Sequence, residues 1–322
     1  MRIKVILLLT GLFFLLAVTS NAQAAQVRAE GEVQATQEAE DESSPSIEQY
    51  RQALRKTVVL QEEYFPNAMD SYLRQMPSRG AKAQSGSVSI VEAASEYSYQ
   101  VKVGGKLPVE LALGAEYIGI NNSTAVKLPA KLTSNAFGLE TTVPFFNIDK
   151  TYFTVGVAML FVSDNWNVRS SSFRIPQRYF LIHQPNEKLT LICGVGVWPD
   201  YDEVVWPIVG FIYKPNDRLT LNIIPKGPEI SYDLNDKLTI FGQGDMSSAE
   251  FEVTKDGRKG VVLEYNEMHL GGGLRYKFNR HIKGSLAAGS IFGRSLKYRD
   301  ETLGKVAIKN GLYTEFRMEI DF

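Results

Sequence analysis

From about residue 90 to the C-terminus, apolar residues alternate one for one with other residues, and this pattern constrains the fold more than any other feature. Residues 109–117 place Val, Leu, Leu, Ala and Tyr at the odd positions, with Glu, Ala, Gly and Glu between them. Residues 153–161 repeat the pattern. Because successive side chains of a β-strand point to opposite faces, the alternation predicts strands with one apolar face. No helix-period stretch interrupts it, so residues 90–322 are predicted to form an all-β domain.

Short polar segments with a central asparagine recur between these strands. The central residues are Asn147, Asn186, Asn216, Asn235 and Asn279. Asparagine tolerates left-handed backbone angles and hydrogen-bonds to its own backbone, so each segment predicts a tight hairpin turn. Each interval must hold two strands and one further connection, which places the turns at one end and irregular loops at the other. Short periplasmic turns opposite longer loops are typical of a transmembrane antiparallel β-barrel.

The turns also predict the number of strands. Two strands after each turn, counting one more turn near residue 105, give about 12 strands, with a range of about 10 to 14 because such barrels favour even numbers. Residues 219–234 are short for two spanning strands, whereas residues 237–253 and 261–278 are long. The rim of the barrel is therefore expected to be lopsided.

The N-terminal residues predict export. Two positive charges in residues 1–4 precede an apolar run over residues 5–18 and a small-x-small site that ends at Ala24. These features indicate a signal peptide, residues 1–24, cleaved after Ala24. The apolar run is shorter than the ~20 residues of a spanning helix, which disfavours the alternative of an uncleaved anchor. The expected location is the outer membrane of a Gram-negative type cell.

Two further segments precede the barrel. Residues 25–45 are acidic and poor in apolar residues, which predicts a disordered linker. Residues 46–77 carry apolar residues at three- and four-residue steps, interrupted by Pro66 and Pro77, and predict a short helical periplasmic segment. That segment is interpreted either as a plug or partner-binding helix, or as a tether.

Composition excludes several classes of function. Lys and Arg number 35 and Asp and Glu 36, so the near-neutral charge gives no electrostatic case for nucleic acid. One cysteine rules out an intrachain disulfide, and one cysteine with three histidines leaves little material for a metal site. We therefore expect no metal and no cofactor.

The last strand and the tyrosines near the turns favour a membrane over water. The apolar face at the C-terminus contains Phe316, Met318, Ile320 and Phe322. An aromatic end on such a strand resembles the insertion signal that the bacterial barrel-assembly machinery reads. Tyrosines three residues before Asn216, Asn235 and Asn279 would form an interfacial girdle. Alternation alone also fits a soluble periplasmic β-protein that binds a ligand. This soluble protein is the alternative to a membrane barrel.

The opposite face of the last strands is charged and is expected to line the lumen. Its candidate residues are Glu267, His269, Arg275, Lys277, Glu315, Arg317, Glu319 and Asp321. These residues are interpreted either as a charged constriction that selects solutes or as a neutralised polar core that closes a narrow barrel.

An enzyme is the rival class, because outer-membrane lipid-modifying enzymes use serine and histidine. His269 shares its face with Glu267, but the turn at Asn279 predicts that His269 pairs with Ile291 rather than with a serine. No catalytic residue is therefore assigned, and the protein is not expected to be an enzyme.

Two segments resemble a family of bacterial outer-membrane β-barrels known only as a domain of unknown function. They are residues 224–238 (IPKGPEISYDLNDKL) and 270–279 (LGGGLRYKFN), within a stretch of about a third of the chain. The resemblance implies a barrel in contact with outer-membrane lipid and implies no activity or substrate. The sequence thus predicts an outer-membrane barrel that is either a passive pore for small solutes or a structural protein.

Overall fold

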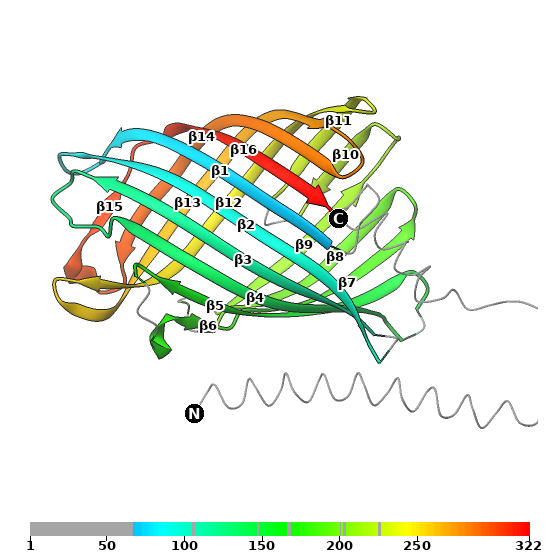
Figure 1. The fold of residues 1–322 in the computed structure, drawn as a ribbon, viewed down its shortest axis with the longest axis horizontal. Coiled ribbons are helices and arrows are strands. Elements are labelled where there is room, and N and C mark those ends of the chain that lie inside the picture. Colours follow the sequence, from blue (N-terminus) through cyan, green and yellow to red (C-terminus); the bar gives the residue numbers. More distant parts are fainter. Residues whose placement is uncertain are drawn as a thin grey trace, which may run out of the picture. The chain divides into compact units, whose positions relative to one another are not determined.

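The computed structural model describes residues 67–104, 107–146, 148–165, 169–199, 201, 204–224 and 227–322. The described residues between 67 and 322 form one compact unit. Its described residues fold into a single closed sheet of antiparallel neighbouring strands (Figure 1). The strands are β1 (Asn67–Gly80), β2 (Ser87–Val103), β3 (Leu107–Asn122), β4 (Lys131–Pro144), β5 (Thr151–Ser163), β6 (Phe173–Arg174), β7 (Gln177–Asn186), β8 (Leu189–Val197), β9 (Val205–Tyr213), β10 (Leu219–Ile223), β11 (Glu229–Asn235), β12 (Leu238–Lys255), β13 (Arg258–Lys277), β14 (Ile282–Tyr298), β15 (Lys305–Ala307) and β16 (Gly311–Asp321).

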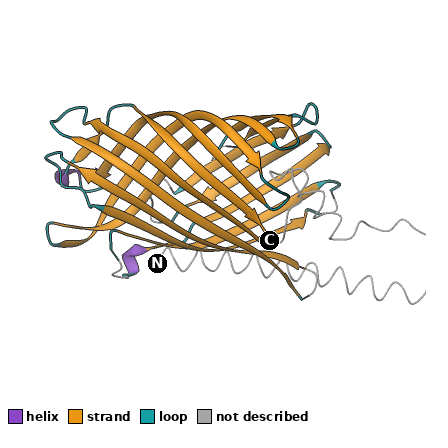
Figure 2. Ribbon diagram, turned by 45° about the horizontal axis from the view of Figure 1, so that its top comes forward, coloured by secondary structure: helices purple, strands orange, loops and turns teal. Residues whose placement is uncertain are grey.

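Fourteen strands make up the wall of this barrel. Of the sixteen strands, β6 pairs only with β5 and β15 only with β14 among the named strands, and both are short. The other fourteen follow one another around the barrel, and β1 pairs with β16 to close it. The predicted antiparallel β-barrel is confirmed, but the central prediction of about 12 strands is too low by two. Figure 2 shows how completely strands dominate the described residues.

The strand that the sequence analysis missed is β1, and the predicted helical segment 46–77 is wrong over its described part. Residues 67–77 belong to β1, which pairs with β2 on one edge and β16 on the other. Exposed Leu73 and buried Arg74 point to opposite faces, as period-two alternation requires. Pro77 does not end a helix. It lies at a register shift between Met76 and Arg79, where a proline is tolerated in a sheet.

Several predictions fall outside the described residues. They are the signal peptide 1–24 with its cleavage at Ala24, the linker 25–45, the helical residues 46–66 and the turn residue Asn147. Within the described ranges, no helix has the length and apolar character needed to cross a membrane. The helical elements found there are two single 3-10 turns, η1 (Ser170–Ser172) and η2 (Glu301–Leu303).

The barrel has two unlike ends, which we call the turn end and the loop end. At the turn end lie the start of β1, the end of β16 and the short turns that contain Asn186, Asn216, Asn235 and Asn279. At three of these turns the asparagine Oδ1 accepts two backbone N–H groups, as Asn279 does from His281 at 2.8 Å and Ile282 at 3.0 Å. None of the four asparagines has a positive φ. The side-chain acceptor, rather than a left-handed backbone, therefore explains asparagine here.

Removing this acceptor is expected to destabilise the barrel modestly. In Asn279→Ala the N–H groups of His281 and Ile282 lose their acceptor, which at about 1 kcal/mol per hydrogen bond lowers the free energy of unfolding by about 1–2 kcal/mol. Urea unfolding of the detergent-folded barrel, followed by the gel shift between folded and heated protein, measures the loss. Asn279→Asp keeps the acceptor and serves as the control. Equal losses in both variants would contradict the role of the Oδ1 atom.

The wall is lopsided, as the sequence predicted. Strands β12 and β13 have 18 and 20 residues, whereas β10 and β11 have 5 and 7. In Figure 1 the long strands run to the end opposite the C-terminus, and β10 and β11 stay near the turn end. Beyond the short strands, β5 and β12 meet in a parallel pairing between Ser163 and Glu252. At the loop end, the sheet therefore closes into a ring through the contact between β5 and β12.

The two faces of the wall differ in their chemistry. On the outer face the large exposed side chains are apolar, including Val209, Leu270, Leu274, Leu286 and Leu312. On β16 the outward residues between Leu312 and Ile320 carry no charge. Inside, the loop end is filled by buried apolar side chains, while charged residues lie on the inner face toward the turn end. The inner surface therefore has an apolar part and a polar part.

Candidate functional site in the barrel interior

The apolar part of the interior is a packed cluster, which we call the loop-end core. It contains Met76, Ala81, Val88, Ile90, Ile118, Ile120, Leu132, Val162, Phe251, Val253, Leu263, Tyr265, Ile291, Leu296, Tyr298, Val306, Ile308 and Tyr313. These residues come from the long strands and from the segment that contains β15. The loop-end core therefore occupies the inner face of the wall at the loop end with buried apolar side chains.

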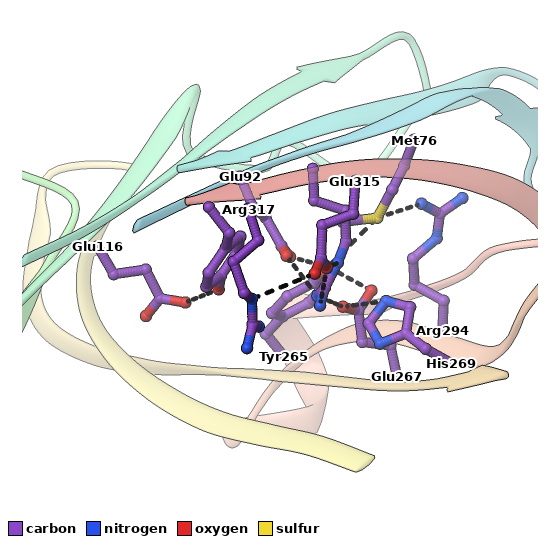
Figure 3. Close-up of polar contacts among 11 residues, drawn as sticks. Met76, Glu92, Glu116, Tyr265, Glu267, His269, Arg294, Glu315 and Arg317 are labelled. Carbon is purple, nitrogen blue, oxygen red and sulfur yellow. Dashed lines mark hydrogen bonds and ion pairs between the residues drawn. The ribbon is translucent and has the colours of Figure 1, made fainter. Parts of the chain in front are cut away.

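Directly against this core lies a buried ionic network, which we call the Arg74 cluster. Its members are Arg74, Glu92, Tyr265, Glu267, His269 and Glu315 (Figure 3). Arg74 contacts Glu315 through Nη2 at 2.7 Å and Nε at 2.8 Å, and Glu92 through Nη1 at 3.0 Å. It therefore bridges β1 to both neighbouring strands, β2 and β16. Charge-assisted hydrogen bonds of this geometry are the strong ones.

The Tyr265 hydroxyl joins two of the carboxyl groups. Its oxygen lies 2.8 Å from Glu92 Oε1 and 2.5 Å from Glu267 Oε2. A phenol has a single proton, so it donates to only one of them. The other contact is a hydrogen bond only when that carboxyl is itself protonated and donates to the phenol oxygen. The geometry therefore fits one neutral carboxyl group between Glu92 and Glu267.

Two further nitrogen-bearing side chains, His269 and Arg294, lie close to the glutamates of the cluster. Besides Arg74, His269 Nε2 lies 2.9 Å from Glu267 Oε1. Arg294 is buried on the core side, with Nη1 3.3 Å from Met76 Sδ. Figure 3 shows His269 and Arg294 on the same side of the three glutamates. Arg74 and Arg294 are the two permanently charged cations of this region.

Glycines give Tyr313 its place in this network. The Tyr313 ring lies edge-on to the ring of His269, with centroids 5.2 Å apart. A Cβ atom on Gly289 would lie 2.7 Å from Tyr313 Cε1, and one on Gly271 would collide with its hydroxyl. Glycine at positions 271 and 289 therefore leaves the room that the Tyr313 side chain occupies.

Toward the turn end the inner face of β16 and β1–β4 is strongly acidic, and we call it the acidic wall. The register places these carboxylates on the same face as Arg74: Asp70, Glu96, Glu110, Glu116, Glu140, Glu319 and Asp321. On the same inner face, only Lys102 and Arg317 are basic among the described residues outside the Arg74 cluster. Asp70 is paired with both Glu96 and Glu319, and Glu110 with Glu140. Like charges in such positions repel, so the wall attracts cations.

Ion pairs join the acidic wall to other strands at a few points. Lys283 Nζ lies 3.7 Å from both Glu319 and Asp321, and Arg178 pairs with Glu140. Arg317 bridges Asp70 at 3.6 Å and Glu315 at 3.5 Å. These pairs offset part of the negative charge of the wall.

The turn end opens into a cavity of about 330 Å³. Its lining residues are Asp217, Arg218, Asp233, Asn235, Asp236, Lys237, Thr239, Arg275, Lys277 and Lys283. Five cations and three aspartates contribute to it, all from β10–β14 and their turns. The mouth is thus polar and of mixed charge, in contrast to the loop-end core.

The predicted lumen residues fall into three places. Glu267, His269 and Glu315 belong to the Arg74 cluster, and Arg317 lies beside it. Arg275 and Lys277 line the mouth, and Glu319 and Asp321 pair with Lys283. The predicted pairing of His269 with Ile291 is confirmed, and in the same register Arg275 pairs with Ser285.

The residues of the predicted insertion signal lie on the outer face of the wall. Phe316 and Phe322 are exposed there, and the Phe322 ring is 6.3 Å from that of Tyr97. Met318 and Ile320 share the Phe316 face of β16. Their predicted role in insertion is a matter of recognition by other proteins and stays a prediction.

Sequence reasoning missed the residue at the centre of the cluster, Arg74, together with Asp70 and Glu92. The reason is that β1 and the first half of β2 were not recognised as strands. The signal was present: in residues 69–76, Asp, Tyr, Arg and Met alternate with Met, Ser, Leu and Gln. The outward set there contains two polar residues, so the contrast between faces is weaker than on β16.

Metal chemistry has little support. Among the described residues, no group of three or more His, Cys, Asp or Glu side chains could hold a metal ion. Cys193 is exposed between outward-facing Leu191 and Val195. Within the same described part of the chain, neither ring nitrogen of His269 has a hydrogen-bond partner of good geometry.

The family model described as "Domain of unknown function (DUF6268)" matches residues 58–319. The chain belongs to the DUF6268 family. The match extends the similarity seen in residues 224–238 and 270–279 over the whole barrel, including β1. None of the curated proteins matches this DUF6268 chain.

Solved structures with a similar fold are outer-membrane barrels. The COG4313 outer membrane channel from Pseudomonas putida F1 is 9% identical, with a TM-score of 0.46 over 81% of this chain and 96% of that one. A Pseudomonas aeruginosa FadL homologue is 11% identical, with a TM-score of 0.40 over 80% and 90%. The Acinetobacter baumannii outer membrane protein Omp33 is 8% identical, with a TM-score of 0.34 over 80% and 99%. These similarities concern the fold alone.

Proposed function

We propose that this DUF6268 protein is an outer-membrane channel for small cationic solutes and that the loop-end core and the Arg74 cluster hold it closed in this structure. The membrane location is supported by the outer face. The uncharged outward residues at the end of the chain run from Leu312 on β16 to Phe322, the residue after the strand. With a rise of about 3.3 Å per residue and a strand tilt of about 40°, these ten steps cover about 25 Å, the height of the apolar band of such barrels.

Aromatic residues support the same placement at the turn end. Tyr213, Tyr232 and Tyr276 are exposed on the outer face just before their turns. Tyr97 and Tyr99 are exposed near the same end, on β2. Rings of this kind mark the membrane–water interface. A soluble periplasmic β-protein would have no reason to expose them together with the apolar side chains above them.

The acidic wall is the observation that carries the proposed preference for cations. Seven inward carboxylates face two basic residues on β16 and β1–β4. A barrel with a purely structural role gains nothing from repulsion between directly paired carboxylates such as Glu110 and Glu140. In a channel, the same repulsion is relieved when cations enter.

The proposed closed state is supported by the other half of the interior. Phe251 and Tyr298 are fully buried in the loop-end core, and the Arg74 cluster ties β1, β2, β13 and β16 together beneath it. Opening therefore requires these side chains to move. The proposal includes no catalytic role, and His269 acts in it as a member of the cluster.

Planar-bilayer recordings in KCl test the proposal. We expect the wild type to show rare, small current steps, because the loop-end core blocks the path. Phe251→Ala combined with Tyr298→Ala removes two large core side chains and is expected to raise the open probability at least tenfold. Leu270→Ala, on the lipid-facing side, is the matched control and should leave the currents unchanged.

Selectivity gives the second readout. In a KCl gradient, the variant with Phe251→Ala and Tyr298→Ala should show a reversal potential whose sign indicates that K⁺ passes more readily than Cl⁻. Glu110→Gln combined with Glu140→Gln should move that potential toward zero. A folded core variant with no current would defeat the channel proposal and leave a structural role, and protein that remains in aqueous extracts of washed membranes would defeat the membrane location.

A further inference from the structure

Three lysines lie side by side on the inner face at the turn end, and we call them the lysine row. Lys277 of β13 is paired with Lys283 of β14. Lys237, the residue before β12, continues the register of Leu238 with Tyr276, and its carbonyl accepts the N–H of Lys277 at 2.8 Å. Like charges in directly paired positions repel each other. A negative group that lies against this row would therefore stabilise it.

Carboxylates border the lysine row on both sides. On β11, Asp233 is paired with Thr239 and accepts a hydrogen bond from its hydroxyl at 2.5 Å. On β16, Glu319 is paired with Lys283, and the Lys283 Nζ atom lies 3.7 Å from both Glu319 and Asp321. At this distance the contacts are longer than hydrogen bonds. The row thus adjoins the acidic wall at β16, so opposite charges face the lumen from neighbouring strands.

A small solute can reach the lysine row through the cavity at the turn end. All three lysines line this cavity of about 330 Å³, and Arg218 adds a further cation to it. Lys237 and Arg218 are exposed, and within the described ranges neither forms an ion pair. Pockets for small molecules have volumes from about 300 Å³ upward. The cavity is thus large enough for a small solute and presents accessible positive charge to it.

The arrangement of charge distinguishes between classes of solute. A simple cation is attracted by the acidic wall but repelled by the lysine row, and a simple anion is repelled by the carboxylates beside the row. A solute with one carboxylate and at least one ammonium group complements both. Complementarity of this kind gives specificity. The mixed charge of the mouth therefore favours a dipolar solute.

We propose that the lysine row binds the carboxylate of a small cationic amino acid whose ammonium groups face the acidic wall. The carboxylate contacts Lys237 and Lys277, and the nearer ammonium group contacts Glu319 and Asp321. A second ammonium group keeps the net charge of the solute positive, which suits the acidic wall. The inference deepens the proposed channel function and rests on it, because it takes the acidic wall to line a lumen that solutes enter.

Isothermal titration calorimetry of the detergent-folded full chain at low ionic strength tests the site with three probes. They are free lysine, with one carboxylate and two ammonium groups, cadaverine, which lacks the carboxylate, and hexanoate, which lacks both ammonium groups. We expect the wild type to bind free lysine at least fivefold more tightly than either of the other two. Equal binding of free lysine and cadaverine would overturn the inference. Equal binding of free lysine and hexanoate would overturn it in favour of a site for simple anions.

Two double variants assign the effect to the lysine row. Lys237→Gln combined with Lys277→Gln should bind free lysine and cadaverine alike. Lys131→Gln combined with Lys259→Gln removes the same charge at the loop end and is the matched control, which should bind free lysine as the wild type does. Equal loss of lysine binding in both would overturn the inference. Because calorimetry needs no transport, a folded core variant without current would refute the channel alone, so the two failures are distinguishable.

Discussion

Replacing Arg74 with glutamine is expected to lower the free energy of unfolding by about 3–5 kcal/mol, the usual cost of removing one partner from a buried ion pair. The side chain is only 6% exposed and contacts Glu92, Glu267 and Glu315. Without its charge, Glu92 loses its ion-pair partner, and Glu315 and Glu267 keep only Arg317 at 3.5 Å and His269 at 2.9 Å. Urea unfolding of the folded barrel in detergent, followed by tryptophan fluorescence and gel shift, measures the loss.

Two variants make this test specific. Arg317→Gln removes an arginine whose side chain is 33% exposed, with partners 3.5 and 3.6 Å away, and is expected to cost about 1 kcal/mol or less. Adding Glu92→Gln to Arg74→Gln removes one of the stranded carboxylates and should restore part of the stability. If Arg74→Gln and Arg317→Gln lose the same amount, the Arg74 cluster is not an electrostatic unit.

The outer face, the turn end and the register of the last strands could be predicted from the sequence. Lipid-facing positions exclude charge, so on β13 and β16 the alternation is strict and its phase is unambiguous. Asparagine turns such as Asn235 and Asn279 fix the hairpins through their side-chain acceptors, so pairs such as His269 with Ile291 follow by counting. These features depend on residues close in the sequence.

The loop-end core could not be predicted in the same way, because the polarity of the strands reverses beyond the apolar band. On β12, Phe251 and Val253 point inward and are buried, while Glu250 and Glu252 lie on the outer face. These two carboxylates are covered by loops: Glu250 pairs with Arg299, and Glu252 with Arg169. A rule that places every apolar residue outward fails there. Only the fold shows where along a strand the reversal occurs.

The Arg74 cluster could not be predicted from the sequence for a different reason, the distance along the chain between its members. Glu267, His269 and Glu315 were on the predicted inner face, but their partners on β1 and β2 lie far away in the sequence. A helical pattern over residues 46–77 competed with a weak alternation over residues 69–76. Pairing with β16, the most distant strand, decided between them. The pairing that closes the barrel thus cannot be read from patterns among neighbouring residues.

Deleting residues 67–80, which form β1, is expected to abolish the folded barrel. The deletion leaves the edges of β2 and β16 without a partner, and in lipid each unsatisfied backbone group costs several kcal/mol. The heat-modifiable gel band and the protease resistance of membrane-inserted protein should both disappear. Deleting residues 25–45, the predicted linker, is the control and should leave both intact. A normal folded band after deletion of β1 would show that the barrel closes without it.

Because that deletion also removes Arg74, a cross-link tests closure without disturbing the cluster. Leu73 and Phe316 are paired across β1 and β16, and both are exposed on the outer face. In a Cys193→Ser background, Leu73→Cys with Phe316→Cys is expected to form a disulfide in most folded molecules under mild oxidation. Leu73→Cys with Leu312→Cys places the second cysteine on the same face but four residues away, and should not cross-link. Equal cross-linking in the two pairs, or none in either, would contradict the β1–β16 register and return residues 67–77 to a segment outside the wall.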